Sequence, residues 1–143
     1  APPAIYTLSL LDALPIFSCR KVTTAFRDCI VDSMQNSTTY PLHAFHYHGT
    51  GTNNAAEAND QTALNTEVET RANGNQGEAG ANAYIYQTVA TCNYTANRAI
   101  VEHGIFSANA NGTLMDRSVF AAINVANGDS IQFTYQCTFA AEA

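Results

Sequence analysis

The sequence predicts a mainly β protein: a small antiparallel β-sandwich of about six strands with one N-terminal amphipathic helix. The first observation is alternation near the C-terminus, where residues 131–139 place apolar and polar side chains in turn. Side chains on a strand point to opposite faces with a period of two, so one face of this segment is apolar. The second observation is composition, since 46% of the residues are hydrophobic and only 13% are charged. The remaining polarity is mostly Asn, Thr, Gln, Ser and Gly, which suits strands and turns better than surface helices.

Four strands are predicted in the C-terminal third, and we expect a meander in which each strand pairs with the next. They cover residues 83–95, 98–107, 113–124 and 129–139. The turn signals between them are Ala96-Asn97, Asn111-Gly112 and Asn127-Gly128. Asn-Gly favours tight hairpins, because both central residues of a type I′ turn need positive φ.

Residues 21–35 are predicted to form the helix. Its apolar residues recur at helical spacing and make one stripe: Val22, Ala25, Phe26, Cys29 and Ile30. A polar cluster at 35–39 and then Pro41 end the helix. We expect it to cover one face or one end of the sheet.

Two further strands are predicted between the helix and the meander. Residues 42–48 form the first, closed by a turn at Gly49-Thr50-Gly51-Thr52, which lacks the Lys and the helix of a phosphate-binding P-loop. Residues 66–72 form the second, an edge strand because Val68 is its only large apolar residue. The rest of this polar region, up to about residue 82, is expected to be a surface loop that faces solvent, a ligand or a neighbouring subunit.

Residues 1–17 look foreign to the rest, and we expect one β-sandwich domain over residues 18–143. The segment has an apolar run but no positively charged start, so it fits a signal peptide poorly. Residues 4–16 resemble the conceptual translation of a sequencing-library adapter, which indicates an artefact fused to a genuine reading frame. The alternative is an ordinary N-terminal strand, or an arm that packs on a neighbour.

Charge and hydropathy exclude two classes of partner. The formal net charge is −6 and no basic patch is present, so we expect no nucleic-acid partner. No run of 18 or more apolar residues occurs, so we expect no membrane span.

The four cysteines do not predict a metal site. Cys19, Cys29, Cys92 and Cys137 are widely and unevenly spaced and form no Cys-x-x-Cys motif, unlike zinc sites. Cys92 and Cys137 fall in predicted strands. We interpret them as two buried thiols, with a disulfide between strands as the alternative.

No catalytic constellation is recognisable, and we expect neither an enzyme nor a cofactor. No Ser stands in a Gly-x-Ser-x-Gly motif, and no Cys has a nearby base. Neighbours on a strand face opposite ways, so Glu102-His103 and Asp116-Arg117 are interpreted as structural charges rather than acid–base dyads.

His46 and His48 are the candidate metal ligands, because residues two apart on a strand share a face. Two imidazoles are too few for a closed site within one chain. An acidic third ligand, or repetition of the pair around a symmetry axis, would be needed. A similar His-x-His arrangement holds iron across three chains in trimeric phage receptor-tip fibres. The alternative, which we favour, is that these are ordinary half-buried or surface histidines.

The C-terminal third carries four short motifs in a fixed order. They read EHGIF at 102–106, GTLMDRSVF at 112–120, INV at 123–125 and GDSIQFTY at 128–135. Upstream pieces at 49–52, 62–64 and 66–68, and Arg71, accompany them. Over residues 20–140 this series resembles virion structural proteins of tailed bacteriophages, of the tail-collar and tail-fibre type.

The resemblance implies a non-enzymatic building block of a phage particle, located in the tail, collar, fibre or head decoration. Its expected partners are copies of itself in a symmetric homo-oligomer, other virion proteins, and a host-surface glycan or receptor. The tyrosines of residues 83–95 (Tyr84, Tyr86 and Tyr94) either bury against a neighbouring subunit or line the protein's own core. The alternative function is a glycan-binding or adhesive β-sandwich module, which would present exposed aromatic side chains on a concave face.

Overall fold

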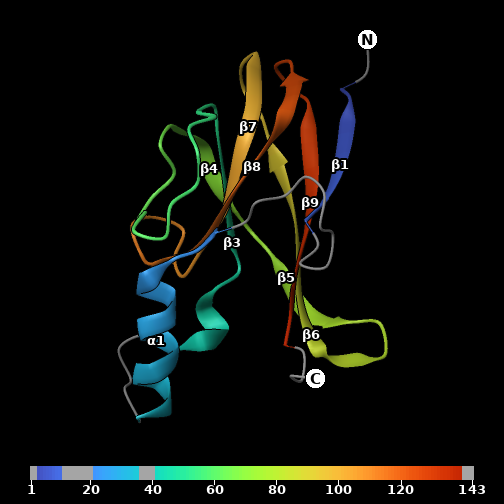
Figure 1. Ribbon diagram of the computed structural model, residues 1–143. Helices are drawn as coiled ribbons and strands as arrows, with labels where there is room; N and C mark the ends of the chain where they lie inside the picture. The colour runs from blue at the N-terminus through green and yellow to red at the C-terminus, as the bar shows by residue number, and fades with distance from the viewer. Residues whose placement is uncertain (1–2, 11–20, 36–40, 140–143) are drawn as a thin grey trace.

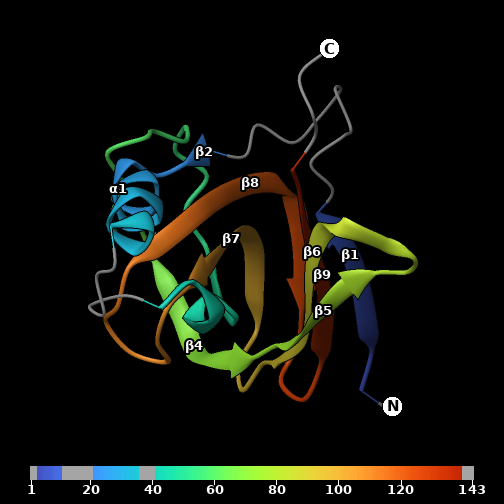
Figure 2. The ribbon, with the colours of Figure 1, turned by 90° about the horizontal axis from the view of Figure 1, so that it is seen from below.

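Two β-sheets packed face to face make up most of the protein (Figures 1 and 2). The computed structural model describes residues 3–10, 21–35 and 41–139. The elements of these residues are β1 (Ile5–Leu10), β2 (Lys21–Val22), α1 (Thr24–Met34), the 3-10 helix η1 (Leu42–Ala44), β3 (Tyr47–Gly51), β4 (Glu67–Asn73), β5 (Asn75–Ala79), β6 (Asn82–Asn93), β7 (Arg98–Phe106), β8 (Leu114–Val125) and β9 (Ser130–Thr138). The mainly β, sandwich-like fold with one α-helix is as predicted.

The two sheets have the orders β1-β9-β6-β5 and β2-β8-β7-β3-β4. All strand pairs are antiparallel except β1 with β9, which are parallel. Apolar side chains from both sheets meet between them and form one core, which includes Ile100, Ile105, Met115, Ile131 and Phe133. The predicted alternation on β9 is confirmed, because Ile131, Phe133 and Tyr135 are buried and Gln132 is exposed.

The predicted four-strand meander is wrong. β6 and β9 are neighbours in one sheet, whereas β7 and β8 are neighbours in the other. The turns at residues 94–97 and 126–129 therefore carry the chain from one sheet to the other. Of the three predicted turns, only Asn111-Gly112 lies in a hairpin within one sheet, and both of its residues have the predicted positive φ, 55° and 73°. A turn signal shows where the chain reverses but does not say which sheet the next strand joins.

The strand count of about six is too low, because β2 and β5 were not predicted as strands and β1 was predicted only as an alternative. β5 is an edge strand whose side chains are almost all exposed, so it carries no apolar alternation. The predicted strand at 42–48 is also misplaced: η1 occupies its start, and β3 begins at Tyr47 and continues through Gly51. The edge position predicted for residues 66–72 is confirmed by β4.

Helix α1 begins three residues later than predicted because Thr23 caps it. The Thr23 hydroxyl accepts the Phe26 N–H at 3.1 Å, and the Thr23 N–H donates to the Met115 carbonyl at 3.0 Å. This anchor leaves Lys21 and Val22 to pair with β8. Buried Phe26 then packs edge-on against Phe45, with ring centroids 4.8 Å apart, so α1 covers one end of the sandwich beside β8 (Figure 2). None of the helices in the described ranges has the length and apolar character needed to cross a membrane.

The N-terminal segment 1–17 is described only over residues 3–10. There, Ile5–Leu10 lies along β9 as an edge strand, as the strand alternative predicted. The Ala4 N–H donates to Asp129 Oδ1 at 2.7 Å, and the Ser130 N–H donates to the Ala4 carbonyl at 3.0 Å. An open sheet edge accepts extended segments through main-chain bonds, largely independent of their sequence. Strand pairing is therefore compatible with an artefactual origin as well as with a genuine one.

Cys92 and Cys137 are not joined by a disulfide. Cys92 pairs with Ile131 in the register of β6 and β9, and Cys137 pairs with Tyr86, so the two cysteines are six residues apart along the ladder. Cys92 is buried, as predicted, while Cys137 is half-buried. Burial raises the pKa of the Cys92 thiol to about 12. Cys19 lies outside the described residues.

The chain turns a corner where it leaves β4 in one sheet and enters β5 in the other (Figure 2). Gly74 is the single residue between these two strands. A Cβ atom here would lie 2.7 Å from the His46 carbonyl oxygen and 2.8 Å from His48 Nε2, and closer still to Thr88 Oγ1. Strands that switch sheets need such a close approach of backbone to side chains.

We expect Gly74→Ala to lower the free energy of unfolding by about 1–3 kcal/mol through overpacking. Urea denaturation measures the loss. The matched control is Gly77→Ala on exposed β5, where a Cβ would meet no atom within 4 Å. An equal effect of the two substitutions would argue against a close-packed corner at Gly74.

Candidate functional site

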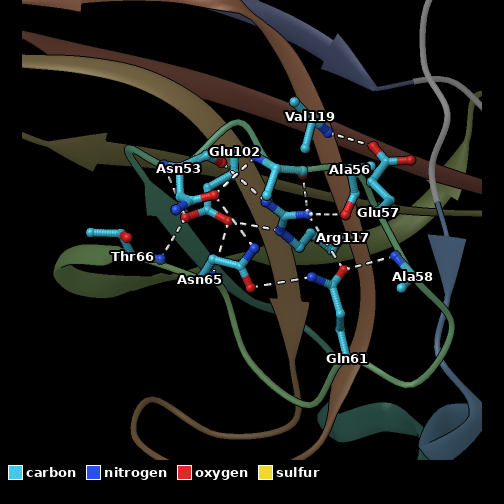
Figure 3. A network of polar contacts seen from close by, with 11 residues as sticks. Asn53, Ala56, Glu57, Ala58, Gln61, Asn65, Thr66, Glu102, Arg117 and Val119 are labelled. Atoms are coloured by element: carbon cyan, nitrogen blue, oxygen red, sulfur yellow. Dashed lines mark hydrogen bonds and ion pairs between the residues drawn. The ribbon is translucent and has the colours of Figure 1, made fainter.

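The predicted surface loop lies over the outer face of the five-stranded sheet, held there by a buried ion pair (Figure 3). Glu102 on β7 and Arg117 on β8 contribute the pair, with Arg117 Nε 2.7 Å from Glu102 Oε2 and both side chains fully buried. The interpretation of Glu102 and Arg117 as structural charges is thus supported. The two residues pair with each other rather than with their sequence neighbours His103 and Asp116.

Glu102 accepts main-chain hydrogen bonds from both ends of the loop. The N–H groups of Asn53 and Thr66 donate to its Oε1 at 3.4 and 2.9 Å, and the Asn65 N–H donates to its Oε2 at 3.2 Å. Arg117 bonds the first part of the loop, since its guanidinium donates to the carbonyls of Asn53 and Ala55 at 3.0 and 2.9 Å. Each charge is therefore solvated by loop main chain instead of water, as a buried charge requires.

Glycines on the sheet make room for this loop. Leu64 from the loop packs with Phe106 and Leu114 in a second, smaller apolar cluster outside the main core. A Cβ at Gly49 would lie 2.9 Å from the Phe106 ring, and one at Gly104 would lie 3.0 Å from Leu64. The predicted turn at 49–52 is consequently wrong: Gly49 and Gly51 lie within β3, where their lack of a side chain lets the loop approach the sheet.

Arg71 on β4 joins the loop after β7 to the same face. Its guanidinium lies 3.3 Å from the centroid of the Phe106 ring and forms a two-point ion pair with Glu67, at 2.6 and 2.9 Å. Nη1 also donates to the main-chain carbonyls of Ala108 and Asn111 at 2.9 and 2.6 Å. A planar guanidinium can make these stacking and hydrogen-bonding contacts together. Beside it lies a polar hollow of about 790 Å³, whose lining includes Thr62, Glu67, Glu69 and Asn109.

A second buried polar network lies between the sheets. His48 Nδ1 is 2.9 Å from His103 Nε2, and His48 Nε2 is 3.1 Å from Thr88 Oγ1. His103 stacks on Phe133, with centroids 4.4 Å apart. Burial, with a smaller contribution from the charge of His46, lowers the pKa of His48 to about 3. Both histidines are completely buried, so this network connects the sheets and is closed to a substrate.

The structure does not assemble a metal site around His46 and His48. His46 precedes β3 and stacks on Tyr47, with centroids 4.4 Å apart, while both ring nitrogens of His48 are occupied within the core. His43 lies on η1 and is exposed. Over residues 3–10, 21–35 and 41–139, no three His, Cys, Asp or Glu side chains are grouped so as to hold a metal ion.

The three tyrosines of β6 differ in burial. Tyr94 is buried, and its hydroxyl donates to Thr50 Oγ1 at 3.3 Å. Tyr86 packs against the core, and its hydroxyl donates to the Phe45 carbonyl at 2.7 Å. Tyr84 remains 55% exposed. Two of the three therefore line the protein's own core.

Exposed apolar side chains gather at the end of the sandwich that α1 covers. Leu42, Tyr84 and Phe139 are 45%, 55% and 61% exposed, and the Phe139 N–H donates to the Tyr84 carbonyl at 3.0 Å. Leu42 and Phe139 also line an almost wholly apolar hollow of about 230 Å³, together with Phe26, Ile30, Phe45, Tyr86 and Met115. We call Leu42, Tyr84, Phe139 and this hollow the apolar end. Exposed apolar patches of this kind are a common feature of protein–protein contact sites.

Comparison with known proteins finds no counterpart for this arrangement: no protein-family model, no curated protein and no solved structure matches the chain.

Proposed function

We propose that the chain is a non-enzymatic structural protein of a bacteriophage virion that assembles as a symmetric homo-oligomer. The proposed location is the tail, collar, fibre or head decoration. The apolar end carries the proposal, because subunits that assemble bury apolar side chains which a monomer leaves exposed.

The two buried polar networks are consistent with a scaffold. The Glu102–Arg117 pair and the His48–His103 pair are fully buried, and each holds parts of the chain together. Fully buried polar side chains of this kind favour a structural role over a catalytic one, because a catalytic group must reach its substrate. The sequence resemblance over residues 20–140 gives the proposal its phage context.

The glycan-binding alternative has less support. A sugar site combines exposed aromatic side chains with polar groups on a concave face. The polar hollow beside Arg71 has no aromatic residue in its lining, and the exposed Tyr84 and Phe139 adjoin an apolar hollow instead.

The solution mass of the chain, measured by light scattering across a dilution series, tests the assembly. We expect a defined oligomer that Leu42→Asp or Phe139→Asp shifts toward the monomer, because each places a charge at the apolar end. The matched control is Ile5→Asp. Ile5 is 74% exposed and pairs with Ser130, the first residue of β9, whereas Phe139 follows the last residue of that strand. Ile5 therefore lies at the other end of β9, and its substitution should leave the mass of the oligomer unchanged.

A monomer at every concentration would contradict assembly by the chain alone. A sugar-binding screen would then test the alternative module. A defined oligomer with unchanged mass in both charge variants would support assembly but place the interface elsewhere.

A further inference from the structure

The same reactive dipeptide, Asn-Gly, occurs three times in the described residues, each time in a different main-chain environment. The pairs are Asn73-Gly74, Asn111-Gly112 and Asn127-Gly128. All three asparagine side chains are exposed. Side-chain exposure therefore does not distinguish them, and any difference must come from the main chain.

Asn-Gly is prone to deamidation, a reaction that needs only water. The main-chain nitrogen of the glycine loses its proton and attacks Cγ of the asparagine. The Cγ–Nδ2 bond breaks, ammonia leaves, and a five-membered succinimide forms. Water then opens the ring at either carbonyl and yields aspartate or isoaspartate. Glycine favours the attack because it has no Cβ to obstruct the approach.

The glycine N–H must lose its proton before the nitrogen can attack, so a hydrogen bond that this N–H donates must first break. The Gly74 N–H donates to the His46 carbonyl and the Gly128 N–H to the Tyr94 carbonyl, each at 2.8 Å. In the part of the chain that the structure describes, the Gly112 N–H donates to no main-chain carbonyl. Its turn is closed by Ser107 and Thr113 instead, through a main-chain bond of 3.0 Å and a bond of 2.8 Å from the Thr113 N–H to Ser107 Oγ.

We propose that Asn111-Gly112 is a deamidation site of the folded protein and that the fold protects the other two pairs. The expected advantage is roughly fivefold in rate, which corresponds to about 1 kcal/mol, the typical net contribution of one hydrogen bond.

The modification would act directly on the contacts of Arg71. In the isoaspartate product, the main chain runs through the former side chain, and the former main-chain carbonyl of residue 111 becomes a free carboxylate. That carbonyl oxygen is the one that Arg71 Nη1 binds at 2.6 Å. The new anion competes with Glu67 for the guanidinium and adds one negative charge to the formal −6, at the edge of the polar hollow. Ageing would thus change the charge and the shape of this surface.

Peptide mapping by mass spectrometry tests the proposal on the folded chain, held in mildly alkaline buffer at physiological temperature and sampled over weeks. We expect Asn111 to convert roughly fivefold faster than Asn73 and Asn127. In denaturant the three rates should converge, because the dipeptide is the same and the hydrogen bonds are gone. Conversion of Asn73 or Asn127 as fast as Asn111 in the folded protein would overturn the proposal.

The variant Asn111→Gln assigns the signal. Its longer side chain disfavours the five-membered ring, so conversion at residue 111 should stop while the rates at Asn73 and Asn127 stay unchanged. A persistent signal of the original size would mean that the modified residue had been misassigned, and it would likewise overturn the proposal.

Discussion

Glu102→Gln should lower the free energy of unfolding by about 3–5 kcal/mol, the usual cost of leaving one partner of a buried ion pair without the other. The substitution keeps the shape of the side chain but removes the charge that faces Arg117 at 2.7 Å. Arg117 would remain fully buried, with its guanidinium hydrogen-bonded to the Asn53 and Ala55 carbonyls and the Gln61 amide oxygen. Urea denaturation followed by circular dichroism measures the change.

The loss should also have a local signature in the loop that the pair holds. The Asn53, Asn65 and Thr66 amides donate to Glu102, so we expect their hydrogen exchange to accelerate in the variant. The matched control is Arg98→Met, which removes a pair with Glu69 that spans 3.9 Å and has Arg98 40% exposed. Such an exposed pair contributes about 1 kcal/mol or less. Equal losses in the two variants would mean that burial of the Glu102–Arg117 pair does not matter.

This pair illustrates which contacts local patterns could predict. The Asn111-Gly112 turn correctly predicted a hairpin of β7 and β8, and so placed residues 102 and 117 on adjacent strands. They share a face because Gly104 pairs with Arg117 and Glu102 lies two residues before Gly104. That this face points away from the core, although Ile100 lies in the core, depends on the register shift between Ile100 and Glu102; a second shift follows between Ile105 and Phe106. A bulge changes which residues share a face, and no residue pattern marked these two positions.

The same limit explains the errors in topology. Alternation on β9 depends on one buried face, so it could be read from residues 131–139 alone. The partner of β9 depends on how the two sheets stack, which is a long-range property. The turn at Asn127-Gly128 forms in the same way whether the next strand joins the same sheet or the other one. Likewise, Gly49 and Gly51 resembled a turn in the local sequence. The reason for glycine at these positions is the close approach of Leu64 and Glu102, which leave no room for a Cβ atom and lie elsewhere in the chain.

Lowering the pH from 7 to 5 should reduce the free energy of unfolding, and we expect His48 to be the group responsible. Burial lowers the pKa of His48 from 6.5 to about 3, so the unfolded chain binds a proton in this range and the folded chain does not. Stability is therefore complete above pH 6.5 and falls as the pH drops toward 3, with a loss of about 2 kcal/mol by pH 5. Asp129 acts lower: hydrogen bonds from Ala126 and Ala4 hold its pKa below 3.8, so its contribution is lost only at more acidic pH.

The pH dependence of urea denaturation in wild type and His48→Asn tests this assignment. The Asn amide can approach His103 as Nδ1 does but cannot take up a proton, so the variant should be less stable at pH 7 yet lose little more by pH 5. The exposed His43→Asn is the matched control and should retain the wild-type slope. Equal slopes in wild type and His48→Asn would rule out His48 as the acid-sensitive group. A flattened slope would instead establish that proton uptake by one buried imidazole between the sheets limits the stability of the sandwich in mild acid.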